Sequence, residues 1–121
     1  MATSDAMIIA EAKEIYTSRA FQQIRDAHRS GRPDLVQIGT CSVQYEPLPF
    51  SGMTAFPNGF VIGREAFETE EELKKTILHE LYRLRRSVLA TGGGDGLDSK
   101  KIKDETAAAF WFAEGNYTLI S

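Results

Sequence analysis

A histidine, a glutamate and an arginine lie within five residues in the segment His79-Glu80-Leu81-Tyr82-Arg83. The segment has the form H-E-x-x-H with arginine in place of the last histidine. In the intact form, two histidines one helical turn apart bind zinc, and the glutamate is the general base for the metal-bound water. Arg83 cannot replace a histidine ligand, because its guanidinium stays protonated and offers no lone pair. We therefore expect neither a bound metal nor a cofactor at this site.

The same residue types suit metal-independent cleavage of RNA. That reaction needs a base for the ribose 2′-hydroxyl, an acid for the leaving 5′-oxygen and a cation for the phosphorane-like transition state. On a helix, His79 and Arg83 share one face and Glu80 lies beside it. His79 can serve either proton role, Glu80 can be its proton partner or orienting group, and Arg83 can hold a phosphate through two parallel hydrogen bonds. We predict these three as the catalytic residues; the alternative is a surface histidine paired with Glu80 or Glu72.

Basic residues cluster at the end of the same segment, where Arg85 and Arg86 follow Arg83. The whole chain has 17 acidic and 14 basic residues, a formal net charge of −3, which gives no general attraction to nucleic acid. A local phosphate-binding patch remains compatible with that total. We predict Arg85, Arg86 and Tyr82 as substrate-binding residues. The alternatives are a solvated face, salt bridges with residues 68–72, and a Tyr82 that packs beside the core.

The composition predicts one domain over residues 1–121. With 42% hydrophobic and 26% charged residues, the chain resembles an ordinary soluble globular protein with a single core. The single cysteine, Cys41, cannot form an internal disulfide, and we expect it to be a small buried hydrophobic residue rather than a catalytic thiol. No stretch is apolar enough to span a membrane, and the N-terminus lacks the pattern of a signal peptide.

The first half of the chain predicts a helix followed by a small sheet. Residues 4–29 have apolar positions at helical spacing, with Ser4 or Thr3 as N-cap. Residues 36–46 are rich in β-branched side chains and predict one strand, bent at Gly39. Two further strands, 52–56 and 59–64, are joined by a Pro-Asn-Gly turn. We expect these strands to form an antiparallel sheet.

The second half predicts two helices joined by a glycine-rich loop over residues 91–96. Thr69 and Glu72 form a capping box, which starts a helix that runs to about residue 90. Asp98 is the expected N-cap of the last helix, whose aromatic residues 110–112 we expect in the core rather than as a platform for base stacking. Residues 116–120 have the composition of a final strand. The predicted fold class is therefore α+β: an N-terminal helix, a small central antiparallel sheet and two C-terminal helices packed on it.

The order of sheet, hairpin, capped His-Glu helix, glycine loop and second helix resembles that of minimal zinc metallopeptidases over residues 52–114. In that family a glutamate on the following helix is a zinc ligand, and Glu105 occupies the corresponding place. The sequence departs from the family's pattern at one position, Arg83, where the family has the second histidine ligand. The resemblance implies an alternative function, a zincin-like peptidase toxin that uses His79, Glu105 and a third ligand not identified in the sequence.

Residues 59–67 (GFVIGREAF) and 79–85 (HELYRLR) also resemble the C-terminal toxin domains of bacterial polymorphic and contact-dependent inhibition systems. Many of those domains are ribonucleases that cleave tRNA, and each is neutralised by a dedicated immunity protein. The resemblance implies a tRNA-cleaving toxin with a cognate immunity partner, delivered from a producing cell and active in the cytoplasm of the target cell. A third hypothesis is a non-catalytic binding module on the same frame.

Overall fold

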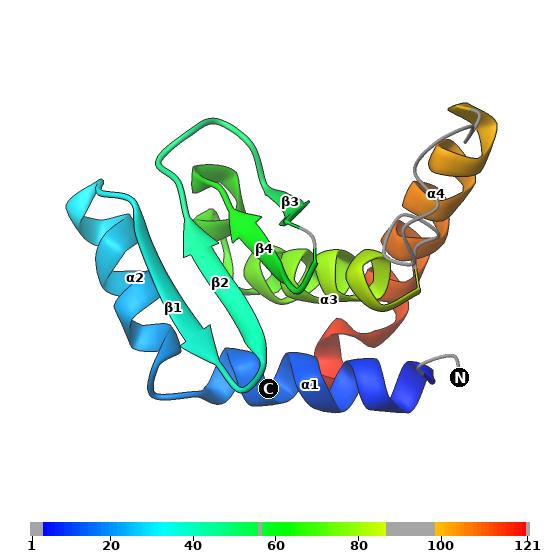
Figure 1. The fold of residues 1–121 in the computed structure, drawn as a ribbon, viewed down its shortest axis with the longest axis horizontal. Helices are drawn as coiled ribbons and strands as arrows, with labels where there is room; N and C mark the ends of the chain where they lie inside the picture. Colours follow the sequence, from blue (N-terminus) through cyan, green and yellow to red (C-terminus); the bar gives the residue numbers. More distant parts are fainter. Residues whose placement is uncertain (1–3, 56, 87–98, 121) are drawn as a thin grey trace.

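The computed structural model describes residues 4–55, 57–86 and 99–120, with side chains for all of these except residues 99–105. Two helices, α1 (Asp5–Thr17) and α2 (Phe21–Ser30), precede a four-stranded sheet, and α3 (Glu70–Arg86) and α4 (Ser99–Asn116) follow it (Figure 1). Two helices pack on the sheet, α2 against β1 and β2, and α3 against β3 and β4, while α1 and α4 pack on α3. The α+β fold class is confirmed. No helix within the described part of the chain is long and apolar enough to cross a membrane.

The predicted N-terminal helix is in fact two helices. Ser4 caps α1 as expected, since its hydroxyl accepts a hydrogen bond from the Met7 N–H at 3.2 Å. The break lies at Ser18, whose backbone is extended and whose hydroxyl accepts from the Ala20 N–H at 3.1 Å. A serine that bonds its own local backbone competes with the helical ladder, and this explains the break. Gly31, with φ of +67°, ends α2 in the left-handed conformation that glycine adopts without strain.

The predicted single strand over residues 36–46 is a hairpin of β1 (Asp34–Ile38) and β2 (Cys41–Tyr45). Its turn passes through Gly39, whose φ of +60° reverses the chain where we expected only a bend. The predicted second hairpin is confirmed, with β3 (Gly52–Ala55) antiparallel to β4 (Gly59–Ile62).

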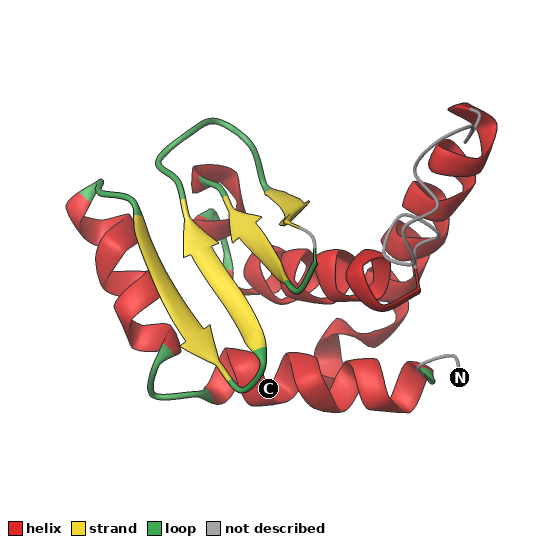
Figure 2. Cartoon of the chain, in the orientation of Figure 1, coloured by secondary structure: helices red, strands yellow, loops and turns green. Residues whose placement is uncertain are grey.

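The expectation of a purely antiparallel sheet is wrong, because β2 pairs with β4 in parallel and the strand order is β1-β2-β4-β3 (Figure 2). The connection over residues 46–51 crosses the end of β4, where the Gly63 N–H donates to the Ser51 carbonyl at 2.8 Å. β3 is thereby placed at the edge, and β4 returns between β2 and β3. All four residues of β4 are buried, whereas β3 has an exposed Met53, so burial favours β4 in the centre.

Helix α3 begins as predicted and presents its expected apolar stripe to the core. The Thr69 hydroxyl accepts from the Glu72 N–H at 3.0 Å, which confirms Thr69 as the N-cap. The stripe is fully or almost fully buried at Leu73, Ile77, Leu81 and Leu84. The expected continuation of this helix to residue 90, the glycine-rich loop and the Asp98 cap all lie outside the described residues. The predicted final strand is wrong: α4 runs to Asn116, and η3 (Tyr117–Ile120) is a 3-10 helix.

Candidate functional site

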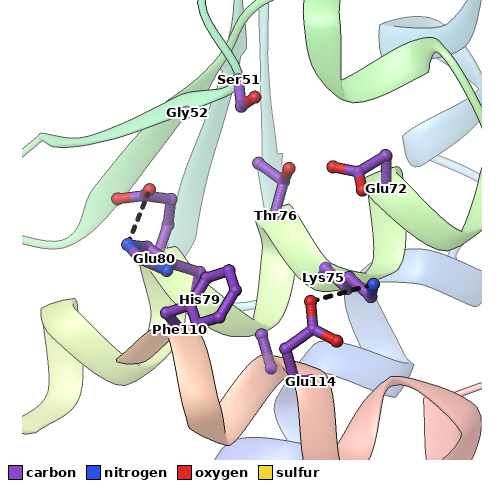
Figure 3. A pocket seen from close by; sticks show the side chains of 10 residues that line it. Ser51, Gly52, Glu72, Lys75, Thr76, His79, Glu80, Phe110 and Glu114 are labelled. Atoms are coloured by element: carbon purple, nitrogen blue, oxygen red, sulfur yellow. Dashed lines mark ion pairs between the residues drawn. The ribbon is translucent and has the colours of Figure 1, made fainter. Parts of the chain in front are cut away.

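A cavity of about 290 Å³ lies where α3, α4 and the start of β3 meet. The predicted catalytic residues His79 and Glu80 are both on its wall, as Figure 3 shows. The described residues that line it are Ser51, Gly52, Glu72, Lys75, Thr76, His79, Glu80, Phe110, Ala113 and Glu114.

Glu80 is the most strongly perturbed carboxyl group of this cavity. Its residue is 3% exposed, and its Oε1 atom has no hydrogen-bond partner among the described residues. Burial disfavours the charged form and raises the pKa of Glu80 to about 7, although the nearby charge of Arg83 opposes this shift. A carboxyl group in this state is partly protonated at neutral pH and can accept or donate a proton.

His79 is neutral at the same pH. Burial and the positive charge of Arg83 together lower the pKa of His79 to about 4. The His79 Nε2 atom lies 3.8 Å from Glu80 Oε2 (Figure 3), a distance that would suit an ion pair. Because of these two pKa values, the partners do not both carry a full charge near neutral pH. The contact is one between a neutral imidazole and a partly protonated carboxyl group.

Gly52 explains how β3 comes so close to the pair. A Cβ atom at this position would lie 2.7 Å from Thr76 Cγ2 and 3.0 Å from Glu80 Cγ. Glycine therefore lets the strand lie directly on α3, and the strand then shields Glu80 from water. This is the local arrangement that raises the pKa of the carboxyl.

Arg83 lies one helical turn beyond His79 but is not among the cavity-lining residues. Its Nε atom is buried and has no hydrogen-bond partner among the described residues. Its charge acts on the pKa of both His79 and Glu80, so it stands close to the pair. The three predicted catalytic residues are thus brought together, with Arg83 at the margin.

The predicted substrate-binding residues are held elsewhere. Arg85 makes two hydrogen bonds to Glu11 of α1, at 2.9 and 2.6 Å, and a third to Asn58 Oδ1. Arg86 pairs with Asp5, and its guanidinium lies 5.1 Å from the centre of the Tyr82 ring. Tyr82 in turn packs against a core phenylalanine of α4. None of these three predicted residues lines the cavity.

Several residues of the cavity were not predicted from the sequence. Lys75 lies between two carboxylates, 2.9 Å from Glu71 and 3.0 Å from Glu114. Glu72, Lys75 and Thr76 share the helical face of His79, so their spacing on α3 was a usable signal. Phe110 and Glu114 come from α4, and no sequence pattern indicates which face of α4 meets α3.

The described residues do not fit a zinc site of the H-E-x-x-H kind. Among them, no three histidine, cysteine, aspartate or glutamate side chains converge. The positive charge of Arg83 close to His79 would also oppose a cation there. The side chain of Glu105 lies outside the described residues, although its backbone belongs to α4. Cys41 is fully buried within the core, as predicted, and burial raises the pKa of its thiol to about 11.

Comparison with protein-family models, with curated proteins and with solved structures gave no match for this chain.

Proposed function

We propose that this chain is a metal-independent ribonuclease in which Glu80 is the general base. One observation carries the proposal: a carboxyl group excluded from solvent, with a pKa of about 7 and an Oε1 atom that has no partner in the described part of the chain, on the wall of a cavity. General bases are most effective when their pKa lies near the working pH. Perturbed carboxyl groups of this kind are concentrated at functional sites.

In the proposed reaction, Glu80 removes the proton of a ribose 2′-hydroxyl, and the 2′-oxygen attacks the adjacent phosphorus. The bond from phosphorus to the 5′-oxygen breaks, which leaves a 2′,3′-cyclic phosphate. The 5′-oxygen takes a proton from His79. His79 is neutral in the free protein and takes up this proton from solvent when the RNA binds, because a phosphodiester anion within about 4–6 Å raises the pKa of a histidine and favours its protonated form.

Arg83 supplies the cation of this reaction. Its charge is close enough to act on both His79 and Glu80, and its buried Nε has no partner among the described residues. A guanidinium beside the reacting phosphate stabilises the charge that develops in the transition state. By contrast, Arg85 and Arg86 are occupied by carboxylates of α1 and are not assigned to the reaction.

The remaining parts of the proposal rest on the resemblance of residues 59–67 and 79–85 to bacterial toxin domains. These parts are tRNA as the substrate, a cognate immunity protein as the partner, and delivery into the cytoplasm of a target cell. They are tested separately from the chemistry, by growth of cells that express the chain with and without the neighbouring downstream gene.

The chemistry is tested by incubating purified protein with total RNA and with tRNA in excess chelator. We expect cleavage to 2′,3′-cyclic phosphate ends. Glu80→Gln and His79→Ala should each lose about 10²–10⁴ in single-turnover rate, and Arg83→Lys about 10²–10³, because lysine keeps the charge and loses the fork. Glu65→Gln, an exposed change on η1 (Arg64–Phe67), is the matched control. Cleavage that disappears with chelator, or a Glu80→Gln variant as fast as wild type, would overturn the proposal.

A second candidate, a non-catalytic module that binds an extended peptide, is favoured by the position of β3. This strand is at the edge of the sheet, and Ser51 and Gly52 at its start line the cavity. An extended peptide can add to such an edge by backbone hydrogen bonds. A folded protein that binds an extended peptide and cleaves neither RNA nor peptide would favour this candidate, whereas zinc-dependent proteolysis that is lost in His79→Ala would contradict both candidates.

A further inference from the structure

Two large aromatic side chains of α4 are turned away from the core. Phe110 is 49% exposed and Trp111 is 69% exposed, and their rings are in edge-to-face contact at 5.3 Å. Their neighbours Ala109, Phe112 and Ala113 are buried. The prediction that residues 110–112 all belong to the core is therefore right for Phe112 and wrong for the other two. Adjacent exposed aromatics need an explanation, because a helix of this composition could expose small or charged residues instead.

Phe110 belongs to the wall of the catalytic cavity. It lines the space that also contains His79 and Glu80, and Figure 3 shows it beside His79. A planar group that lies against the Phe110 ring is therefore next to the proposed acid and base. The ring is a positioning surface within the site and not a separate patch.

We infer that Phe110, with Trp111 beside it, is the stacking platform for an unpaired base of the RNA next to the cleaved phosphate. This inference rests on the proposed function and names its substrate class. Bases stack on exposed aromatic rings in proteins that bind single-stranded nucleic acid, whatever the sequence. A base within a duplex has both faces covered, so the substrate must be a loop or a single strand.

The charges of the cavity agree with a base rather than a phosphate at this position. Glu72 and Glu114 both line the cavity, and the charge of its lysine, Lys75, is already balanced by Glu71 and Glu114. Carboxylates repel a phosphate, whereas they accept hydrogen bonds from the amino groups on base edges. The backbone of the RNA is therefore placed on the side of Arg83, and the base lies between Phe110 and the carboxylates. Bases that carry an amino group, namely adenine, cytosine and guanine, should be preferred to uracil.

Trp111 is the only tryptophan of the chain, so its fluorescence reports on this surface without labelling. The probe is a single-stranded DNA hexamer, which lacks the 2′-hydroxyl and cannot be cleaved by the proposed reaction. We expect the hexamer to quench the emission, and the same strand in a duplex to do so far less. Phe110→Leu should weaken binding about tenfold to a hundredfold, because leucine keeps the apolar bulk and loses the ring, and Phe110→Tyr should bind like wild type.

Leu35→Ala, at an exposed apolar residue on β1, is the matched control and should bind like wild type. Absence of quenching, equal quenching by single strand and duplex, or equal binding by wild type and Phe110→Leu would overturn the inference. The readout does not depend on catalysis. Metal-free RNA cleavage with unchanged binding by Phe110→Leu would refute the platform alone, while stacking without any cleavage of RNA would refute the proposed function alone.

Discussion

The difference in unfolding free energy between the Glu80→Gln variant and wild type should favour the variant more at alkaline than at acidic pH. The pKa of Glu80 is raised from 4.5 to about 7 by burial, and one pKa unit corresponds to about 1.4 kcal/mol. Because the folded-state pKa is the higher one, the carboxyl stabilises the fold fully only below pH 4.5. This contribution is lost as the pH rises from 4.5 to 7. Glutamine does not titrate, so the stability of the variant does not fall for this reason as the pH rises.

The expected gain of Glu80→Gln over wild type from this effect is about 1 kcal/mol at pH 5 and about 3 kcal/mol at pH 8. Any pH-independent cost of burying the amide cancels between the two conditions. The assay is urea unfolding of both proteins at the two pH values, followed by the fluorescence of Trp111. If the difference in unfolding free energy between variant and wild type is the same at pH 5 and pH 8, the carboxyl is not desolvated and the argument for a poised base fails.

Glu71→Gln is a control of opposite sign. Glu71 is exposed, and its pKa is lowered by a hydrogen bond from Lys75, so its ionised form stabilises the fold above its ordinary pKa. Its substitution should therefore destabilise the protein at pH 8 and not stabilise it.

Three further predictions concern single residues. Gly52→Ala should destabilise the fold by about 1–3 kcal/mol in urea unfolding, because its Cβ would lie 2.7 Å from a buried Thr76 methyl group; an unchanged midpoint would show that β3 is not held against α3. Thr69→Ala should lower the unfolding free energy by about 1 kcal/mol through loss of the N-cap of α3. Thr69→Ser should keep most of this stabilisation, because its hydroxyl can also cap the helix. The Cys41 thiol should resist a thiol reagent at pH 8 until urea unfolds the protein, since it is fully buried and its pKa is raised to about 11; rapid labelling of the native protein would contradict this placement.

Local signals were enough to predict α3, its cap and the second hairpin. The periodicity of the apolar stripe and the Asn58-Gly59 turn are properties of short segments, so a local pattern is enough to indicate them. The grouping of His79, Glu80 and Arg83 could also be predicted, because positions three and four apart on a helix are neighbours.

The remaining features depend on residues far apart in the sequence. Arg85 was predicted to bind substrate, yet its partner Glu11 lies 74 positions away and no local pattern connects them. The parallel pairing of β2 with β4 follows from a connection that passes over the end of a later strand. The exposure of Phe110 is set by how α4 is rotated against α3, which the composition of α4 does not determine.

The contact between α1 and η3 has a consequence for the order in which the protein can fold. Helix α1 is separated from η3 by most of the sequence, yet it lies against this segment, which ends at the fully buried Ile120 (Figure 1). The apolar side of α1 is covered by α3 and α2 as well, and the part of it that meets η3 stays uncovered until η3 is in place. Because this contact joins segments from opposite parts of the sequence, its closure carries a high loop-closure cost, and it should form late and slowly in folding.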